Sequence, residues 1–194
     1  MEMECTYRQD KPPMSTWMGR LIYLPEMTPQ DVCREDIAHA LSLMCRGGGH
    51  VRYFYSVAQH SINCAMEAAA RGYSCRVQLA ALLHDGGEAY LSDLIRPVKA
   101  LVKDYAPLEA HVDACVRSAF GLVLSEEEAG QVRSVDDAML HHEFLALRDD
   151  VAIYKVAPQC AGKQDFSQRD PAEVETEFLK LLSILEVQAG TALQ

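Results

Sequence analysis

The chain has 194 residues, of which 49% are hydrophobic and 24% charged; this composition excludes general disorder, and the length suits a single domain over residues 1–194. The net charge is −10, from 18 Lys and Arg against 28 Asp and Glu, which argues against binding to a nucleic acid polymer or an anionic membrane. No run approaches the roughly 18 apolar residues of a membrane span, so we expect no membrane association.

The sequence of the first half of the chain predicts an irregular arm followed by three helices. Prolines and a glycine interrupt residues 1–27, so we expect this arm to pack on the body without regular structure. Thr28 can cap a first helix and Pro29 suits its first position, while three glycines from Gly47 end it. Ser56 begins a second helix, and an almost wholly apolar run marks a buried third. These predicted helices cover 29–46, 56–71 and 75–84.

The second half predicts further helices separated by short breaks. Ser125 and Glu128 form a capping-box pattern, and Asp170 with Pro171 caps the last helix. An alternating strand pattern occurs briefly at 51–55. The predicted helices cover 98–105, 107–120 and 125–147, and a last one begins at 171. The fold class is therefore expected to be all-α.

These elements divide the single domain into three parts. We expect an N-terminal arm over 1–27, a core over 28–150, and a flap with the C-terminal helix over 151–194. In that last helix, the residues expected to face inward are Val174, Phe178, Leu181, Leu182, Ile184 and Leu185. The seven cysteines are odd in number and include no CxxC pair, so reduced thiols and a cytoplasmic protein are expected.

The most informative polar residues are His84 and Asp85, at the end of the apolar third helix. A polar pair at such a place needs partners, and an imidazole nitrogen and a carboxylate oxygen can ligate one divalent ion. His60 in the second predicted helix and Asp136 in the sixth would complete a set of two histidines and two aspartates. Taken singly, His60 is better interpreted as a core histidine, and Asp136 beside Asp137 as a solvated acidic step.

The sequence around these residues resembles the HD-domain metal-dependent phosphohydrolases, closest to the small branch that acts on nucleotides. The segments that carry the resemblance are RGGGH at 46–50, YSVAQHS at 55–61, LLHDGGE at 82–88 and DLIRPVK at 93–99. Residues 132–143 resemble the last ligand helix of that family. The resemblance covers about residues 28–150. It implies an all-α HD-domain helical bundle with a central metal site.

The resemblance also implies the identity of the metal ligands. The matching residues are His60, His84, Asp85 and Asp136, with Asp137 as the alternative for the last. A second ion would need two further histidines between Asp85 and Asp136, and only His111 lies there. We therefore expect one divalent ion. A mixed nitrogen and oxygen set suits Co, Mn, Mg, Fe, Ni or Zn, and Co or Mg is preferred here.

The expected catalytic residues are Glu88, Asp85 and Arg46. Glu88 matches the acid of the family that positions or deprotonates the attacking water, and Arg46 matches the arginine that holds a phosphate. Glu88 follows Asp85 by three residues, so a helical turn would place both on one face. The planar guanidinium of Arg46 suits phosphate oxygens.

The expected substrate-binding residues are Arg46, Gly47, His50, Asp93 and Lys99. Asp93 matches a carboxylate near the sugar in the deoxynucleotidases. Gly47 stands where the bacterial deoxynucleotidases carry a tryptophan, so the loss of bulk predicts room for longer phosphate tails. His50 and Lys99 could line the phosphate path, and each could equally be a surface charge.

The expected function is a divalent-metal-dependent phosphohydrolase acting on nucleotide or nucleoside-analogue mono-, di- and triphosphates. The resemblance implies substrates such as deoxyadenosine triphosphate or the phosphates of the nucleoside-analogue antibiotic oxetanocin A, and hence a role in antibiotic biosynthesis. Two alternatives are a metal-bound nucleotide sensor without turnover and a phosphodiesterase of the same fold. A homodimer, or an assembly with an enzyme of the same pathway, is left open.

Overall fold

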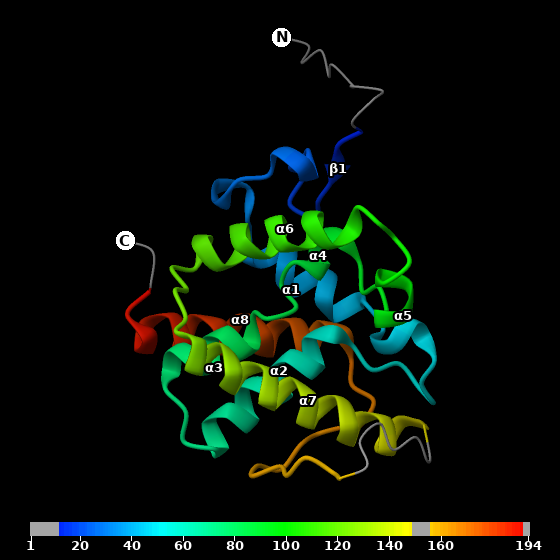
Figure 1. Ribbon diagram of the computed structural model, residues 1–194, viewed down its shortest axis with the longest axis vertical. Helices are drawn as coiled ribbons and strands as arrows, with labels where there is room; N and C mark the ends of the chain where they lie inside the picture. Colours follow the sequence, from blue (N-terminus) through cyan, green and yellow to red (C-terminus); the bar gives the residue numbers. More distant parts are fainter. Residues whose placement is uncertain (1–11, 149–155, 192–194) are drawn as a thin grey trace.

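The computed structural model describes residues 12–148 and 156–191, so residues 1–11 of the predicted arm and part of the predicted flap lie outside it. The described part holds eight α-helices and one short hairpin, which confirms the all-α class (Figure 1). The helices are α1 Arg34–Leu43, α2 Val57–Ala70, α3 Cys75–Leu82, α4 Glu88–Leu91, α5 Arg96–Lys99, α6 Tyr105–Ala119, α7 Glu126–Arg148 and α8 Pro171–Ala189.

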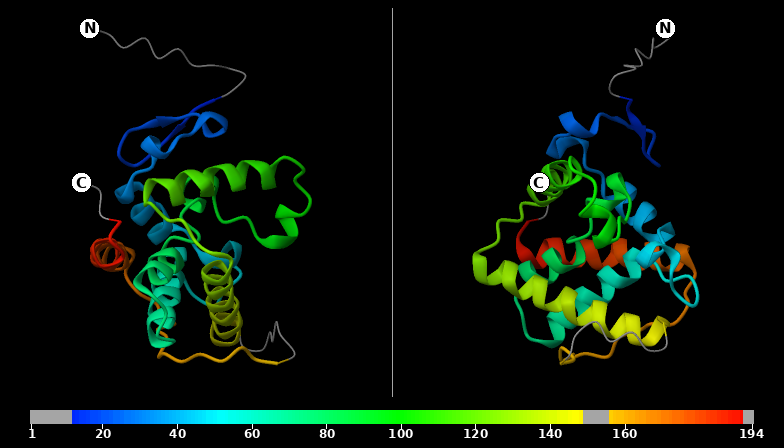
Figure 2. Two further views of the ribbon diagram at one scale, coloured as in Figure 1. Left: turned by 60° about the vertical axis from the view of Figure 1, so that its left-hand side comes forward. Right: turned by 45° about the vertical axis from the view of Figure 1, so that its right-hand side comes forward.

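Helix α2 lies inside the bundle and packs against α3, α7 and α8, while α8 also covers α1. Helix α6 crosses over the ends of this bundle, between it and the N-terminal segment (Figure 2). Large side chains such as Leu79, Met139 and Phe178 are fully buried between these helices. This packing brings the C-terminal end of α3 and the middle of α7 to one place beside α2. Among the described residues, no helix combines the length and apolar character needed to cross a membrane.

The caps predicted from the sequence are confirmed for three helices. Ser56 Oγ accepts from the backbone N–H of Gln59 at 3.1 Å, which begins α2. Before α7, Ser125 and Glu128 each accept from the other's backbone N–H. Asp170 caps α8 by accepting from the N–H of Ala172 at 2.8 Å. Each bond satisfies an otherwise unpaired helical N–H, so local chemistry determines these helix starts.

The predicted first helix over 29–46 is wrong at both ends. The N–H and Oγ1 of Thr28 both donate to Asp31 Oδ2, and this closes a 3₁₀ turn over Pro29–Asp31. Val32 and Cys33 are then extended before α1 begins at Arg34.

Two other expectations in this part of the chain are also wrong. Residues 51–55 form a turn in place of a strand, flanked by a single bridge between Cys45 and Ser56. The arm holds a hairpin, Met14–Ser15 with Leu21–Ile22, because Ile22 is buried and Gly19 turns the chain with a φ of +76°.

The C-terminal half also departs from expectation in three places. The helix predicted over 98–105 is wrong: α5 covers only Arg96–Lys99, and Leu101 just beyond it is exposed, so a longer helix would bury little. In α8 the inward side chains are buried as predicted except Ile184, which is 44% exposed and faces solvent, and Leu181, which is half-buried. Helix α6 begins at Tyr105, two residues before the predicted start.

Candidate metal centre

The four side chains predicted as metal ligands meet where α2, α3 and α7 converge. His60 comes from α2, His84 and Asp85 directly follow α3, and Asp136 lies on α7. His60 Nε2 lies 3.2 Å from His84 Nε2 and 3.3 Å from Asp136 Oδ1. His84 Nε2 lies 3.3 Å from Asp85 Oδ1. Donor atoms about 2.1 Å from one ion are about 3.0–3.4 Å apart in octahedral or tetrahedral sites, so these atoms fit a shared cation.

The second nitrogen of each histidine ring has its own partner. His84 Nδ1 lies 2.7 Å from the carbonyl oxygen of Ala81, and His60 Nδ1 lies 2.7 Å from Glu143 Oε1. Both partners are acceptors, which places a proton on each Nδ1 and leaves the lone pair on each Nε2. Two lone pairs facing each other at 3.2 Å need a shared positive charge. This is the arrangement in which outer partners orient metal-binding histidines.

The charges around the histidines also indicate that a cation is needed between the two rings. Burial lowers the pKa of His84, but the Asp85 charge and the hydrogen bond to Asp136 outweigh it and raise the pKa to about 10. Burial raises the pKa of Asp136, but hydrogen bonds from His60 and His84 hold it well below its usual range. The carboxylates therefore stay ionised and attract a cation, either protons on the imidazoles or a divalent ion in their place.

A cysteine absent from the predicted ligand set also lies here. Cys64 Sγ is 3.5 Å from His60 Nε2, and ligand atoms of His60, Cys64 and His84 all lie within 4.8 Å of one another. This group could hold a metal ion. The sequence carried a signal, because Cys64 follows His60 by four residues in a helix and so shares its face.

The structure separates the two neighbouring aspartates. Asp136 Oδ1 faces His60, whereas Asp137 Oδ1 lies 3.9 Å from the guanidinium of Arg96 at the surface. Arg96 Nη2 also lies 3.5 Å from Asp136 Oδ2. The geometry therefore favours Asp136 over Asp137 as the last ligand.

Arg46 lies beside the histidine cluster in a 3₁₀ turn over Arg46–Gly49. Its Nη1 is 3.2 Å from Asp85 Oδ2, and its Nη2 is 3.6 Å from Glu143 Oε2. The three glycines after it all have positive φ, near +63° at Gly47. Glycine adopts this conformation without the cost that other residues meet, so backbone geometry requires the glycine run. The N–H of Gly47 donates to Asp93 Oδ2 at 3.2 Å, which anchors the turn.

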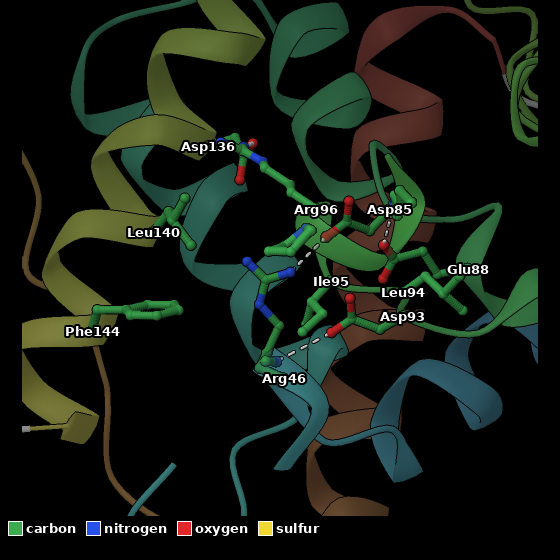
Figure 3. Close-up of a pocket in the computed structure, with 13 residues that line it drawn as sticks. Arg46, Asp85, Glu88, Asp93, Leu94, Ile95, Arg96, Asp136, Leu140 and Phe144 are labelled. Atoms are coloured by element: carbon green, nitrogen blue, oxygen red, sulfur yellow. Dashed lines mark hydrogen bonds and ion pairs between the residues drawn. The ribbon is translucent and has the colours of Figure 1, made fainter. Parts of the chain in front are cut away.

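A cavity of about 430 Å³ opens next to these groups. Figure 3 shows two sides, with α7 on one and the segment around Asp93–Arg96 on the other. The lining residues are Arg46, Gly47, Asp85, Glu88, Asp93, Leu94, Ile95, Arg96, Pro97, Lys99, Asp136, Leu140 and Phe144. Of the predicted substrate-binding residues, His50 does not line the cavity; it is exposed beyond the glycine turn.

Glu88 lines the cavity at the start of α4, with a backbone hydrogen bond from its N–H to the carbonyl of Asp85. Its Oε1 lies 3.4 Å from Lys99 Nζ, and its buried Oε2 has no hydrogen-bond partner. Burial and the charges of Asp85 and Asp93 raise its pKa to about 8. Lys99 also pairs with Glu109 of α6, so its ammonium lies between two carboxylates. A carboxyl group tuned this way exchanges protons near neutral pH.

Sequence reasoning also missed Glu143. It is 2% exposed and contacts both His60 and Arg46. The spacing could have indicated it, because Glu143 follows Asp136 by seven residues, two turns along the same face of α7.

Comparison with known proteins places the chain among relatives of undescribed activity. No family model matches it. The uncharacterized protein YfdR of Escherichia coli is 37% identical over 109 residues, which cover 56% of this chain and 58% of YfdR. The uncharacterized protein RCAP_rcc00048 of Rhodobacter capsulatus is 44% identical over 182 residues, which cover 89% of this chain and 88% of that protein. The chain therefore belongs to the same family as RCAP_rcc00048.

Proposed function

We propose that this chain is an HD-domain type, divalent-metal-dependent phosphohydrolase that removes phosphate from nucleotides or nucleoside-analogue phosphates. The observation that carries the proposal is the convergence of His60, His84, Asp85 and Asp136 beside a partly buried arginine at the wall of one cavity. When bound, a divalent ion supplies Lewis acidity and positive charge for the phosphate oxygens. The set of nitrogen and oxygen donors, with Cys64 nearby, suits Co, Mn, Fe, Ni or Zn, and Mg less well.

Arg46 would hold the phosphate. Its guanidinium already bridges Asp85 and Glu143, so its position is fixed before a substrate enters. The planar fork can donate two parallel bonds to phosphate oxygens. Preorganised donors of this kind stabilise the charge that spreads over the equatorial oxygens during transfer.

Glu88 would act as the general base. Its unpartnered Oε2 can accept a proton from a water molecule as the water oxygen forms a bond to phosphorus. The bond from phosphorus to the ester or anhydride oxygen breaks, and that oxygen leaves with the electron pair and takes a proton from solvent. Lys99 holds the other carboxylate oxygen of Glu88 and so fixes the direction of Oε2.

The far end of the cavity would receive the organic part of the substrate. Leu140 and Phe144 of α7 face Ile95 across it (Figure 3), and Pro97 also lines the cavity. Aromatic and aliphatic walls suit a flat base, which gains by burial and stacking. This end favours a nucleotide over a small sugar phosphate.

The test is release of inorganic phosphate from a panel of nucleoside mono-, di- and triphosphates with each of several divalent ions. Wild-type protein should release phosphate, and Glu88→Gln should keep its metal while losing turnover by about 10²-fold or more. Glu109→Gln is the matched control, because Glu109 pairs with the same lysine but does not line the cavity; it should keep most of the turnover.

Other outcomes would point to the rival functions. Tight nucleotide binding with metal but no phosphate release would favour a sensor. Cleavage of cyclic or 3′–5′ diesters in preference to terminal phosphates would favour a phosphodiesterase. A Glu88→Gln variant with a near-normal rate would remove Glu88 from the mechanism.

A further inference from the structure

Glu143 is a buried carboxylate to which the predicted chemistry gives no role. It lies on α7, is 2% exposed, and contacts three polar groups. Its Oε1 lies 2.7 Å from His60 Nδ1 and accepts from the Tyr55 hydroxyl at 2.9 Å. Its Oε2 lies 3.6 Å from Arg46 Nη2. A charge buried to this extent is costly unless several partners compensate it, and here each oxygen has one or more.

The hydrogen bonds continue away from Glu143 to the C-terminal segment. The Tyr55 hydroxyl accepts from Asn63 Nδ2 at 2.9 Å, so it donates to Glu143 and accepts from Asn63 at once. Asn63 Nδ2 also donates to the carbonyl of Asp165 at 2.9 Å. Every donor in this series of hydrogen bonds has an acceptor, which fixes the orientation of the Glu143 carboxylate before any ligand binds.

We propose that Glu143 is a positioning residue for the metal centre, which holds the His60 ring with its Nε2 lone pair directed at Asp136 and His84. This inference rests on the proposed metal-dependent function. A carboxylate on the outer nitrogen fixes the ring orientation and makes the inner nitrogen a better ligand. The second oxygen of Glu143 ties Arg46 to the same group, so one side chain aligns the metal ligand with the phosphate-binding arginine.

The positioning role of Glu143 depends on its charge and its acceptor oxygens, so it can be distinguished from a role in packing alone. Glutamine has almost the same volume as glutamate, so Glu143→Gln preserves the packing between α2 and α7. It removes the negative charge and turns an amide NH₂ toward either His60 Nδ1 or Arg46, both of which are donors. A residue that only fills space would tolerate this change.

The experiment measures metal affinity without substrate, by equilibrium dialysis of the purified full chain against Mn²⁺ and Zn²⁺. Glu143→Gln should weaken binding by about 10-fold or more, the usual cost of losing such an outer partner. Tyr55→Phe keeps the Glu143 charge beside His60 and removes only one of the bonds that orient it, so it should weaken binding, but by less than Glu143→Gln does. Glu67→Gln is the second control. Glu67 is an equally buried carboxylate on the same helix as His60. It binds backbone N–H groups of Ala161 and Gly162 and makes no bond to His60, so its loss should leave the affinity unchanged.

A further measurement on unmodified protein keeps the inference testable if Glu143→Gln fails to fold. In zinc-loaded wild-type protein with ¹⁵N-labelled histidine, the His60 ring should be protonated at Nδ1 and bound through Nε2. A ring protonated at Nε2, or a folded Glu143→Gln variant with wild-type metal affinity, would overturn the positioning role. A large loss of metal affinity without any phosphate release by wild type would support the positioning role and refute the proposed phosphohydrolase instead.

Discussion

The two sides of the cavity are built differently. One side consists of the long helix α7, on which Asp136 is largely covered and contacts the fully buried His60 of α2. The opposite side consists of the segment from Asp93 to Lys99, in which α5 is a single turn and the Arg96 side chain is 67% exposed. The side chains suited to a metal lie on the first side. The second side carries cations and apolar side chains at the entrance.

This difference indicates a division of work. Residues held by long packed helices keep their geometry to within a fraction of an ångström, which metal binding requires. Residues on short exposed segments can move and vary, which suits the recognition of different ligands. We therefore expect changes on the helical side to abolish function, and changes on the segment side to alter selectivity.

The largest expected effect is that of His84→Ala on the helical side. Removing this imidazole takes away one of four converging donors and leaves His60 with fewer partners for its cation. The purified variant should lose stoichiometric divalent metal in elemental analysis and, under the proposed function, all phosphate release.

His142→Ala is the matched control for that experiment. Like His84, His142 is a partly covered histidine. It lies on α7 and contacts the carbonyl oxygen of Pro158, away from the cluster of His60, His84, Asp85 and Asp136. Metal content should stay at the wild-type level in this variant. Stoichiometric metal in His84→Ala would show that the four-residue set is not the metal centre.

A smaller effect is expected at the glycine turn, where selectivity is at issue. Gly47 lines the cavity and Gly49 does not, yet both have positive φ, +63° and +79°. Tryptophan at either position meets the same kind of backbone strain, roughly 1–2 kcal/mol. Only Gly47→Trp should also fill space at the phosphate end.

The measurement compares triphosphate and monophosphate turnover in the two variants. Gly47→Trp should reduce triphosphate hydrolysis more than monophosphate hydrolysis, whereas Gly49→Trp should reduce both alike or neither. Equal selectivity in both variants would mean that the glycines serve backbone conformation alone. Wild-type protein that cleaves monophosphates only would also contradict the predicted room for longer tails.

Much of the helical side could be predicted from the sequence. The apolar run before His84, the cap at Ser56 and the period of α7 define where each helix lies. The resemblance then selects His60, the pair His84 and Asp85, and Asp136. The metal and catalytic roles of these residues stay predictions, although the structure brings the side chains together.

What the sequence could not provide is which outer carboxylate meets which ring. Glu143 is one of 28 acidic residues, and its contact with His60 depends on how α2 and α7 pack. Lys99 lines the cavity, and the pairing of its ammonium with both Glu88 and Glu109 depends on how α6 packs beside α5. Such pairings are set by tertiary packing, which leaves little trace in a single sequence.

The smallest effect should come from Asp113, on α6 behind the segment side. Its Oδ1 occupies the space that a Cβ on Gly87 would need, and burial together with the Glu109 charge raises its pKa to about 6. The unfolded chain ionises this group near its ordinary value of 3.8. A raised pKa means that the folded state favours the neutral acid, so stability present below about pH 4 is lost as the pH rises through 6.

Asparagine at this position stays neutral at every pH and should remove that loss. With a chelator present to keep metal out, Asp113→Asn should be more stable than wild type at pH 8. The expected gain is about 1 kcal/mol, reduced from the full shift because the carboxyl is partly exposed. The advantage should be smaller at pH 4.5 and should vanish only below about pH 4, where Asp113 is protonated in the unfolded chain as well. Thermal unfolding of both proteins at pH 4.5, 6 and 8 measures this, since other carboxyl groups contribute equally to each. A difference in Tm that does not change with pH would show that Asp113 is ionised in the folded protein throughout. Burial beside Gly87 would then not raise the pKa of its carboxyl group.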